Sequence, residues 1–160
     1  MVENSKNLLI KLIFLISVIA LVSAFFIEYV LGHQPCNLCI LERIPYLLAI
    51  IIILLNFKFS HYEKFFILLL SIIFLAGAII SLYHLGIEQG LIQESLVCDL
   101  KNGSNILSKE EILKQLQEKS VSCKDVTFKM FGLSLTSYNI LISILITFSA
   151  GKIYFNYEKN

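Results

Sequence analysis

The stretch QPCNLCILERIP, residues 34–45, sets two cysteines three positions apart, then an arginine and a proline, at the edge of a long apolar segment. Proline is tolerated in the first turn of a helix and is costly in its interior. Pro45 therefore predicts a helix that begins between Glu42 and Ile44. The pair Cys36 and Cys39 comes just before that helix, where a loop gives way to the apolar segment.

The composition is that of a membrane protein. Of the 160 residues 57% are hydrophobic and only 16% are charged, and the mean hydropathy of +0.78 is too high for a soluble domain of this length. Four apolar runs are long enough to cross a hydrocarbon core of roughly 30 Å. They cover residues 12–31, 44–59, 65–83 and 131–154. Backbone groups in lipid must be satisfied within the segment, so the runs predict an all-α, four-helix transmembrane bundle that forms a single domain, residues 1–160.

The number of helices determines which loops share a side of the membrane. Both termini and the connection at residues 56–64 lie on one face, while the loops at residues 32–43 and 84–130 lie on the other. All four cysteines are expected on that second face: Cys36, Cys39, Cys98 and Cys123. Lysines close to the helix ends on the first face favour cytoplasmic termini and periplasmic cysteine loops. Paired cysteines also persist in an oxidising compartment such as the periplasm.

The second of these loops is the only sizeable part of the chain outside the apolar runs. Ser108 and Glu111 match a capping box that leads into apolar residues spaced along one face, so a short amphipathic helix is predicted to about Lys119. We interpret this helix as resting on the lipid headgroups, in preference to docking a partner.

The Cys36/Cys39 pair has the spacing of a redox centre. Two intervening residues let the sulfur atoms meet in a small ring, and a helix N-terminus stabilises a thiolate. Arg43, four residues beyond Cys39, is close enough to add a cationic field. The alternative for Arg43 is an ordinary anchor at the membrane interface.

The second cysteine pair allows more than one interpretation. Cys98 and Cys123 are separated by 24 residues, which suits a disulfide that braces a loop, but also a relay that passes electrons from the loop to the membrane. A zinc site made of the four cysteines, with His33 and His84 as further donors, is the third possibility. An oxidising exterior and the lack of a second Cys-x-x-Cys motif argue against zinc, so no metal is expected.

Three stretches together resemble one known family. PCNLCILERIPYLL at residues 35–48, YHLGIEQG at 83–90 and FGLSLTSYNIL at 131–141, with four apolar runs and a cysteine pair in the second outer loop, closely resemble the bacterial disulfide bond formation protein B (DsbB) family. The resemblance covers nearly the whole chain. It implies a thiol:quinone oxidoreductase of the bacterial inner membrane that reoxidises a periplasmic thioredoxin-fold oxidase of the DsbA type.

The resemblance also implies roles for individual residues. Cys98 would be attacked by the partner's thiolate, with Cys123 as its shuttle mate. Cys36 would exchange with that loop pair, and Cys39 would face the quinone. Arg43 would hold the quinone and stabilise negative charge.

The same resemblance implies ubiquinone or menaquinone as the cofactor, drawn from the membrane pool. His84 is expected to border the quinone together with Arg43 and Cys39, to pass protons, or to cap the helix end at the interface. Glu88, four residues further on, shares its helix face. Glu28 is expected to be an ordinary interfacial residue, with a local proton donor as the alternative. No nucleic-acid partner is expected.

Two other functions compete with the quinone-linked oxidase. One is a non-enzymatic membrane module in which two disulfides only brace the outer loops. The other keeps the chemistry with a different client, as in vitamin K epoxide reductase-like proteins, which place their Cys-x-x-Cys late in the bundle, unlike the early pair of this chain.

Overall fold

A computed structural model describes residues 2–93, 122–124, 129–130 and 132–158. In chain order its elements are α1 (Val2–Tyr29), α2 (Asn37–Leu41), α3 (Ile44–Lys58), the 3-10 turn η1 (Ser60–Tyr62), α4 (Glu63–Glu88), β1 (Lys129–Met130), β2 (Leu133–Ser134) and α6 (Leu135–Glu158). Cys98 and the predicted amphipathic helix at residues 108–119 fall outside the described residues.

Four stretches are long and apolar enough to cross a membrane: Lys6–Tyr29, Asn37–Lys58, Glu63–Glu88 and Leu135–Asn156. They confirm the predicted all-α bundle of four apolar helices. The second stretch contains both α2 and α3, which follow one another with only Glu42 and Arg43 between them. Helix α3 begins at Ile44 with Pro45 in its first turn, where the missing N–H costs no helical hydrogen bond.

Most helix ends differ from the sequence-based boundaries, and the largest difference is at α1, which begins at Val2 and not at residue 12. Two of the differences lie near the cysteine pair. Helix α4 runs to Glu88, past the predicted end at residue 83, because its last turns carry polar side chains that bind neighbouring elements. Helix α6 begins at Leu135, after the predicted start at residue 131, because a small antiparallel hairpin of β1 and β2 precedes it. Gly132 connects the two strands at φ +83°, a conformation that glycine adopts without strain.

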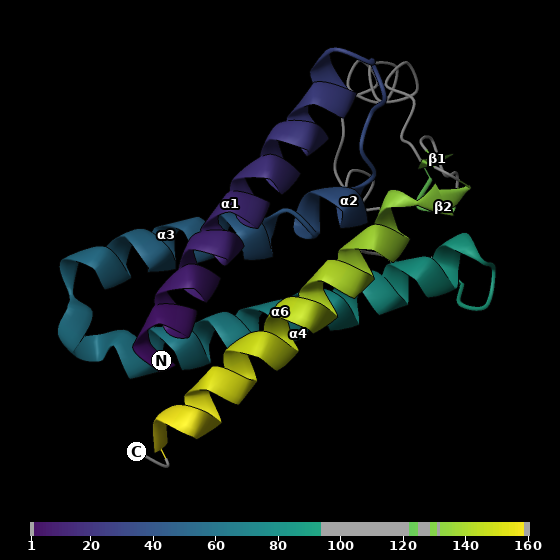
Figure 1. The fold of residues 1–160 in the computed structure, drawn as a ribbon. Coiled ribbons are helices and arrows are strands. Elements are labelled where there is room, and N and C mark those ends of the chain that lie inside the picture. The colour runs from purple at the N-terminus through teal and green to yellow at the C-terminus, as the bar shows by residue number, and fades with distance from the viewer. Residues whose placement is uncertain (1, 94–121, 125–128, 131, 159–160) are drawn as a thin grey trace, which may run out of the picture.

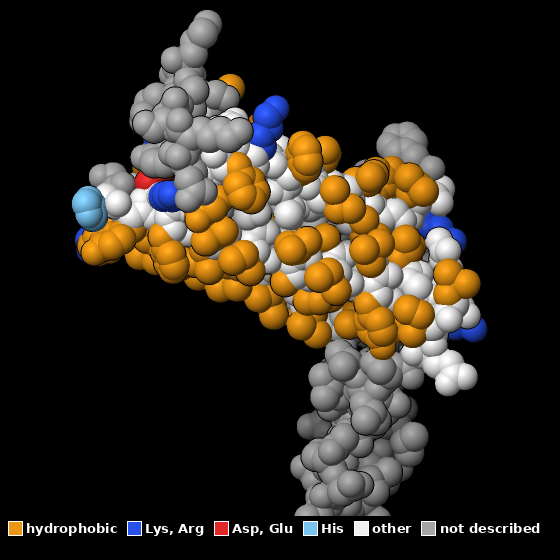
Figure 2. Space-filling view, turned by 90° about the horizontal axis from the view of Figure 1, so that it is seen from below, with side chains coloured by type: hydrophobic (Ala, Val, Ile, Leu, Met, Phe, Trp, Pro, Cys, Tyr) orange, Lys and Arg blue, Asp and Glu red, His pale blue; other side chains and the backbone are white. Residues whose placement is uncertain are grey.

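Helices α4 and α6 lie side by side, while α1 packs against α3 and α3 against α4 (Figure 1). The core between them is apolar and includes Ile13 of α1, Ala49 and Ile53 of α3, and Phe74 of α4. Outward-facing Leu, Ile and Phe side chains cover most of the face shown in Figure 2. Such a surface is expected where lipid, and not water, surrounds the helices.

Gly77 allows α4 to approach the first turn of α3. A Cβ atom at this position would stand 3.0 Å from the Cγ atom of Pro45. Small residues let helix backbones approach closely in membrane proteins, where packing and not the hydrophobic effect drives association. The close approach holds the C-terminal half of α4 against the segment that carries the cysteine pair.

We expect Gly77→Ala to lower the melting temperature of the purified protein in detergent, because the added methyl group overpacks the contact with the rigid proline ring. Overpacking of this kind costs about 1–3 kcal/mol. Gly151→Ala is the matched control, since its new Cβ would lie 3.6 Å from the Ser71 hydroxyl oxygen, an ordinary contact. Equal melting temperatures for the two variants would contradict the assigned role of Gly77.

Candidate redox site

The cysteine pair is organised by the short helix α2. Cys36 is the N-cap, and its Sγ atom accepts a hydrogen bond of 3.2 Å from the backbone N–H of Cys39. The two Sγ atoms lie 2.7 Å apart, so a small rotation brings them to the roughly 2.05 Å of a disulfide bond. The sequence predicted that both cysteines precede the second long helix, whereas Cys39 lies inside α2, a separate helix in front of α3.

The surroundings of the two cysteines differ. Cys36 is 5% exposed, whereas Cys39 is half-buried. The hydrogen bond with Cys39 raises the pKa of the Cys36 thiol and burial raises it further, while the contact with His84 acts in the opposite direction. The net effect keeps Cys36 protonated at neutral pH.

We therefore expect a maleimide to modify Cys39 ahead of Cys36 in the reduced protein at neutral pH. A pKa one unit higher lowers the thiolate fraction about tenfold, and burial restricts access further. Fragment-resolved mass spectrometry at short times measures the ratio of the two adducts. Both cysteines should react alike after denaturation, and preferential modification of Cys36 in the folded protein would be the contrary result.

His84 connects the cysteine pair to an acidic side chain. Its Nε2 atom lies 3.5 Å from Cys36 Sγ, and its Nδ1 atom lies 2.8 Å from Glu42 Oε1. Thr136 Oγ1 is 3.2 Å from the same Nδ1 atom and donates a 2.7 Å hydrogen bond to Glu88 Oε1. His84 is 1% exposed and Glu42 is 8% exposed, so three elements, α2, α4 and α6, meet through buried polar groups.

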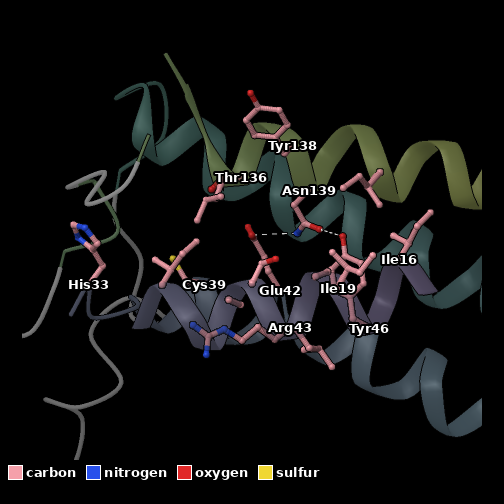
Figure 3. Close-up of a pocket in the computed structure, with 17 residues that line it drawn as sticks. Ile16, Ile19, His33, Cys39, Glu42, Arg43, Tyr46, Thr136, Tyr138 and Asn139 are labelled. Carbon is pink, nitrogen blue, oxygen red and sulfur yellow. Dashed lines mark hydrogen bonds between the residues drawn. The ribbon is translucent and has the colours of Figure 1, made fainter. Parts of the chain in front are cut away.

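A second set of contacts fixes the carboxylate of Glu42. Asn139 Nδ2 donates hydrogen bonds to Glu42 Oε2 at 3.1 Å and to Ser81 Oγ at 2.7 Å. The hydroxyl of Tyr46 donates to Asn139 Oδ1. Figure 3 shows Glu42 and Asn139 turned toward each other, with Tyr46 beyond them. Because every polar atom of the Asn139 amide has a partner, its orientation and that of Glu42 are determined together.

Arg43 lies on the other side of the cysteine segment. Its Nη1 atom donates a hydrogen bond of 2.5 Å to Glu28 Oε2 near the end of α1, and its guanidinium carbon stands 5.3 Å from the ring centre of Phe25. Both charged side chains are about one-fifth exposed. Glu28 was predicted to be an ordinary interfacial residue, and the structure pairs it with Arg43.

A cavity of about 440 Å³ opens beside these residues (Figure 3). One wall comes from apolar side chains of α1, and the opposite walls from the α2–α3 segment and α6. The side chains with polar groups in its lining are Ser23, His33, Cys39, Glu42, Arg43, Tyr46, Thr136, Tyr138 and Asn139. His84 does not line this cavity, because its ring faces Cys36 and Glu42 instead.

The structure describes three of the four predicted site cysteines, namely Cys36, Cys39 and Cys123. Cys123 is buried in the same apolar cluster as Cys36, together with Leu38 and Ile87. Cys98 lies outside the described residues. One member of the loop pair is thus placed beside the buried thiol of the Cys-x-x-Cys pair.

Cys36, Cys39 and His84 bring one potential metal-ligand atom each within 4.8 Å of one another. Thiolates are the donors that zinc would need from this pair. Because the two sulfur atoms also lie close enough to form a disulfide, which offers no thiolate, these residues could hold a metal only in the reduced form of the pair.

Sequence reasoning did not select four polar residues of this site: Glu42, Tyr46, Thr136 and Asn139. Glu42 stands between Cys39 and Arg43 in the quoted stretch, and its place in an otherwise apolar helical run was a signal. Thr136 and Asn139 share one face of α6 at a spacing of three residues. Only their contacts with α2 and α4 distinguish them from other small polar residues in a membrane helix.

Comparison with known proteins supports one family. The sequence profile of the family described as "Disulfide bond formation protein DsbB" matches residues 6–152. A protein of Rickettsia prowazekii (strain Madrid E), "Uncharacterized protein RP370", is 34% identical over 151 residues, which cover 91% of this chain and 86% of that protein. No solved structure matches the chain.

Proposed function

Since this chain belongs to the DsbB family and is therefore a disulfide-generating membrane oxidoreductase, we propose that it passes electrons from a thioredoxin-fold dithiol oxidase to a membrane quinone. The observation that carries this proposal is the cavity of about 440 Å³, which Cys39 and Arg43 line beside the apolar wall of α1. Its volume lies in the range of small-molecule sites, which combine apolar walls with few polar groups.

The lining suits the head group of a quinone. A quinone is a flat, largely apolar ring with two carbonyl oxygens, and it dissolves in the bilayer. The apolar side chains of α1 match the faces of the ring, while the Arg43 guanidinium can donate to a carbonyl oxygen. When bound, the quinone supplies the capacity to accept two electrons. Ubiquinone and menaquinone both meet this description.

The chain's own residues provide the electron path. Cys98 and Cys123 form the loop pair that exchanges with the partner oxidase, and Cys36 and Cys39 form the pair that exchanges with the quinone. The burial of Cys123 beside Cys36 supports thiol–disulfide exchange between the two pairs. Arg43 stabilises the negative charge that develops at Cys39 and in the cavity.

The proposed orientation places the termini in the cytoplasm and the cysteine loops in the periplasm of a bacterial inner membrane. Lysines support it, since Lys58 and Lys64 flank the short connection between α3 and α4, at the end of the bundle far from the cysteines. Short loops rich in lysine favour the cytoplasmic side. A periplasmic cysteine face also places the loop pair in an oxidising compartment.

Mixing the purified protein with a short-chain quinone and a reduced thioredoxin-fold oxidase tests the function directly. We expect loss of the quinone absorbance together with oxidation of the partner, and no turnover in Cys39→Ser, because the sulfur that faces the quinone is gone. A structural module would show no quinone reduction by the wild type. Full turnover in Cys39→Ser would falsify the assigned electron path.

Arg43→Met tests the electrostatic role. We expect kcat/KM for the quinone to fall roughly ten- to a hundredfold, because a charge-assisted hydrogen bond contributes about 1.5–3 kcal/mol. Steady-state kinetics at several quinone concentrations measures the loss. Lys58→Met at the opposite end of α3 is the control and should leave kcat/KM unchanged. Equal kinetics for both variants would assign Arg43 to membrane anchoring alone.

A further inference from the structure

Cys36 faces a histidine on the side away from the cavity. His84 Nε2 is 3.5 Å from its Sγ atom, and the imidazole is 1% exposed. An ionisable side chain buried this deeply within a membrane segment is costly to keep unless it has a specific partner or task. His84 has partners at both ring nitrogens, and one of them is a reacting sulfur atom.

The carboxylate of Glu42 determines which nitrogen of His84 carries the proton. A carboxylate only accepts, so the 2.8 Å contact places a hydrogen on Nδ1. Thr136 agrees with this assignment, since its hydroxyl donates to Glu88 and therefore turns a lone pair toward the same Nδ1–H. In the neutral imidazole, the Nε2 atom then carries the lone pair and lies 3.5 Å from Cys36 Sγ, with Glu88 Oε1 at 3.8 Å from the same nitrogen.

Formation of the Cys36–Cys39 disulfide needs such an acceptor. The Sγ–Sγ bond can form only as the S–H bond of Cys36 breaks, and this thiol is buried and protonated at neutral pH. Two polar contacts of Cys36 Sγ are with Cys39, its partner in the new bond, and with the ring nitrogen Nε2 of His84. His84 is therefore placed to receive the proton.

Resting on the proposed function, we propose that His84 is the general base that takes the Cys36 proton when the pair is reoxidised, and that Glu42 is the residue that positions it. The Sγ–Sγ bond forms, and the two electrons of the dithiol reduce the quinone to the hydroquinone. One proton leaves Cys36 for Nε2, while the Nδ1 proton shifts to Glu42. The other proton comes from the Cys39 thiol.

The position of Glu42 completes the path. One of its oxygens contacts His84, and the residue also lines the cavity that Cys39 lines. The hydroquinone needs two protons, so Glu42 on the cavity wall can deliver the proton that it received from Nδ1, and the Cys39 thiol supplies the other. No net charge is then left in the bundle, and His84 keeps the Cys36 proton on Nε2 until its protons exchange back to the starting tautomer. In this assignment His84 accepts the proton of the Cys36 thiol and does not bind the quinone.

Two variants test this role. Glu42→Gln keeps the size and the bond to Asn139, but its amide NH₂ would face Nδ1 and favour the wrong tautomer, with the hydrogen on Nε2. His84→Gln removes the base itself. His61→Gln is the matched control, because His61 is exposed in η1 at the other end of the bundle.

The decisive measurement is closure of the reduced pair in quinone-free protein by diamide, a soluble oxidant that accepts two electrons and two protons. We expect both site variants to close the pair about 100-fold more slowly than wild type, in the range that loss of general base catalysis produces. His61→Gln should close at the wild-type rate. Wild-type closure rates in Glu42→Gln would overturn the proposal, even if His84→Gln failed to fold.

The pH dependence of the closure rate distinguishes a general base from a residue that only holds the structure in place. The titratable groups that face His84 are Cys36 at the N-cap of α2, Glu42 before α3 and Glu88 within α4, while Thr136 of α6 is neutral. We expect the deficit of both site variants to shrink as the pH rises, because hydroxide replaces the missing base. A deficit that is constant with pH would overturn the proposal.

Quinone binding, measured by equilibrium dialysis, distinguishes this proposal from the role of a quinone ligand. We expect His84→Gln to bind a short-chain quinone as wild type does. Weakened quinone binding with normal closure by diamide would overturn the proposal and make His84 a quinone ligand. If the wild type reduces no quinone but forms the Cys36–Cys39 disulfide at a rate that depends on His84, the proposed quinone function is wrong, and the role of His84 as general base is supported.

Discussion

The hydrogen bond between His84 and Glu42 is the contact on which the arrangement of the site depends. It joins the last turns of α4 to the residue between α2 and α3, and Asn139 and Thr136 extend the connection to α6. Four polar side chains placed inside an apolar bundle stabilise it only when each has a partner. Because all four are paired, they fix the position of the cysteine segment relative to α4 and α6. This arrangement places His84 Nε2 3.5 Å from Cys36 Sγ.

The apolar packing makes this polar arrangement possible. Gly77 brings α4 against Pro45, and Tyr46, one residue further on, reaches both Phe74 through its ring and Asn139 through its hydroxyl. A helix that starts at a proline has a fixed first turn. The start of α3 is thus a rigid point, from which Arg43 projects toward α1 and Glu42 toward α4 and α6.

The sequence predicted the all-α bundle because hydropathy alone decides which segments lipid can hold. It also predicted the start of α3 from Pro45. It did not predict the hairpin before α6, since residues such as Leu133 are apolar enough to continue a membrane helix and only Gly132 indicates a turn. It selected Cys36, Cys39, Arg43 and His84, because their residue types carry chemistry. It did not select Glu42 and Thr136, because a glutamate before a helix and a threonine in a membrane helix become recognisable as partners of His84 only through contacts between distant segments.

The two cysteines of the pair have different neighbours, and this asymmetry follows from the geometry of α2. Cys39, one turn into the helix, lines the cavity beside Arg43, which is paired with Glu28. Cys36 caps the same helix and lies against His84 and Cys123. If the two cysteines had equivalent surroundings, either sulfur could react with the quinone and either could exchange with the loop pair. In the proposed electron path, Cys39 is the sulfur that reduces the quinone in the cavity, and Cys36 is the sulfur that exchanges with the loop pair and loses its proton to His84.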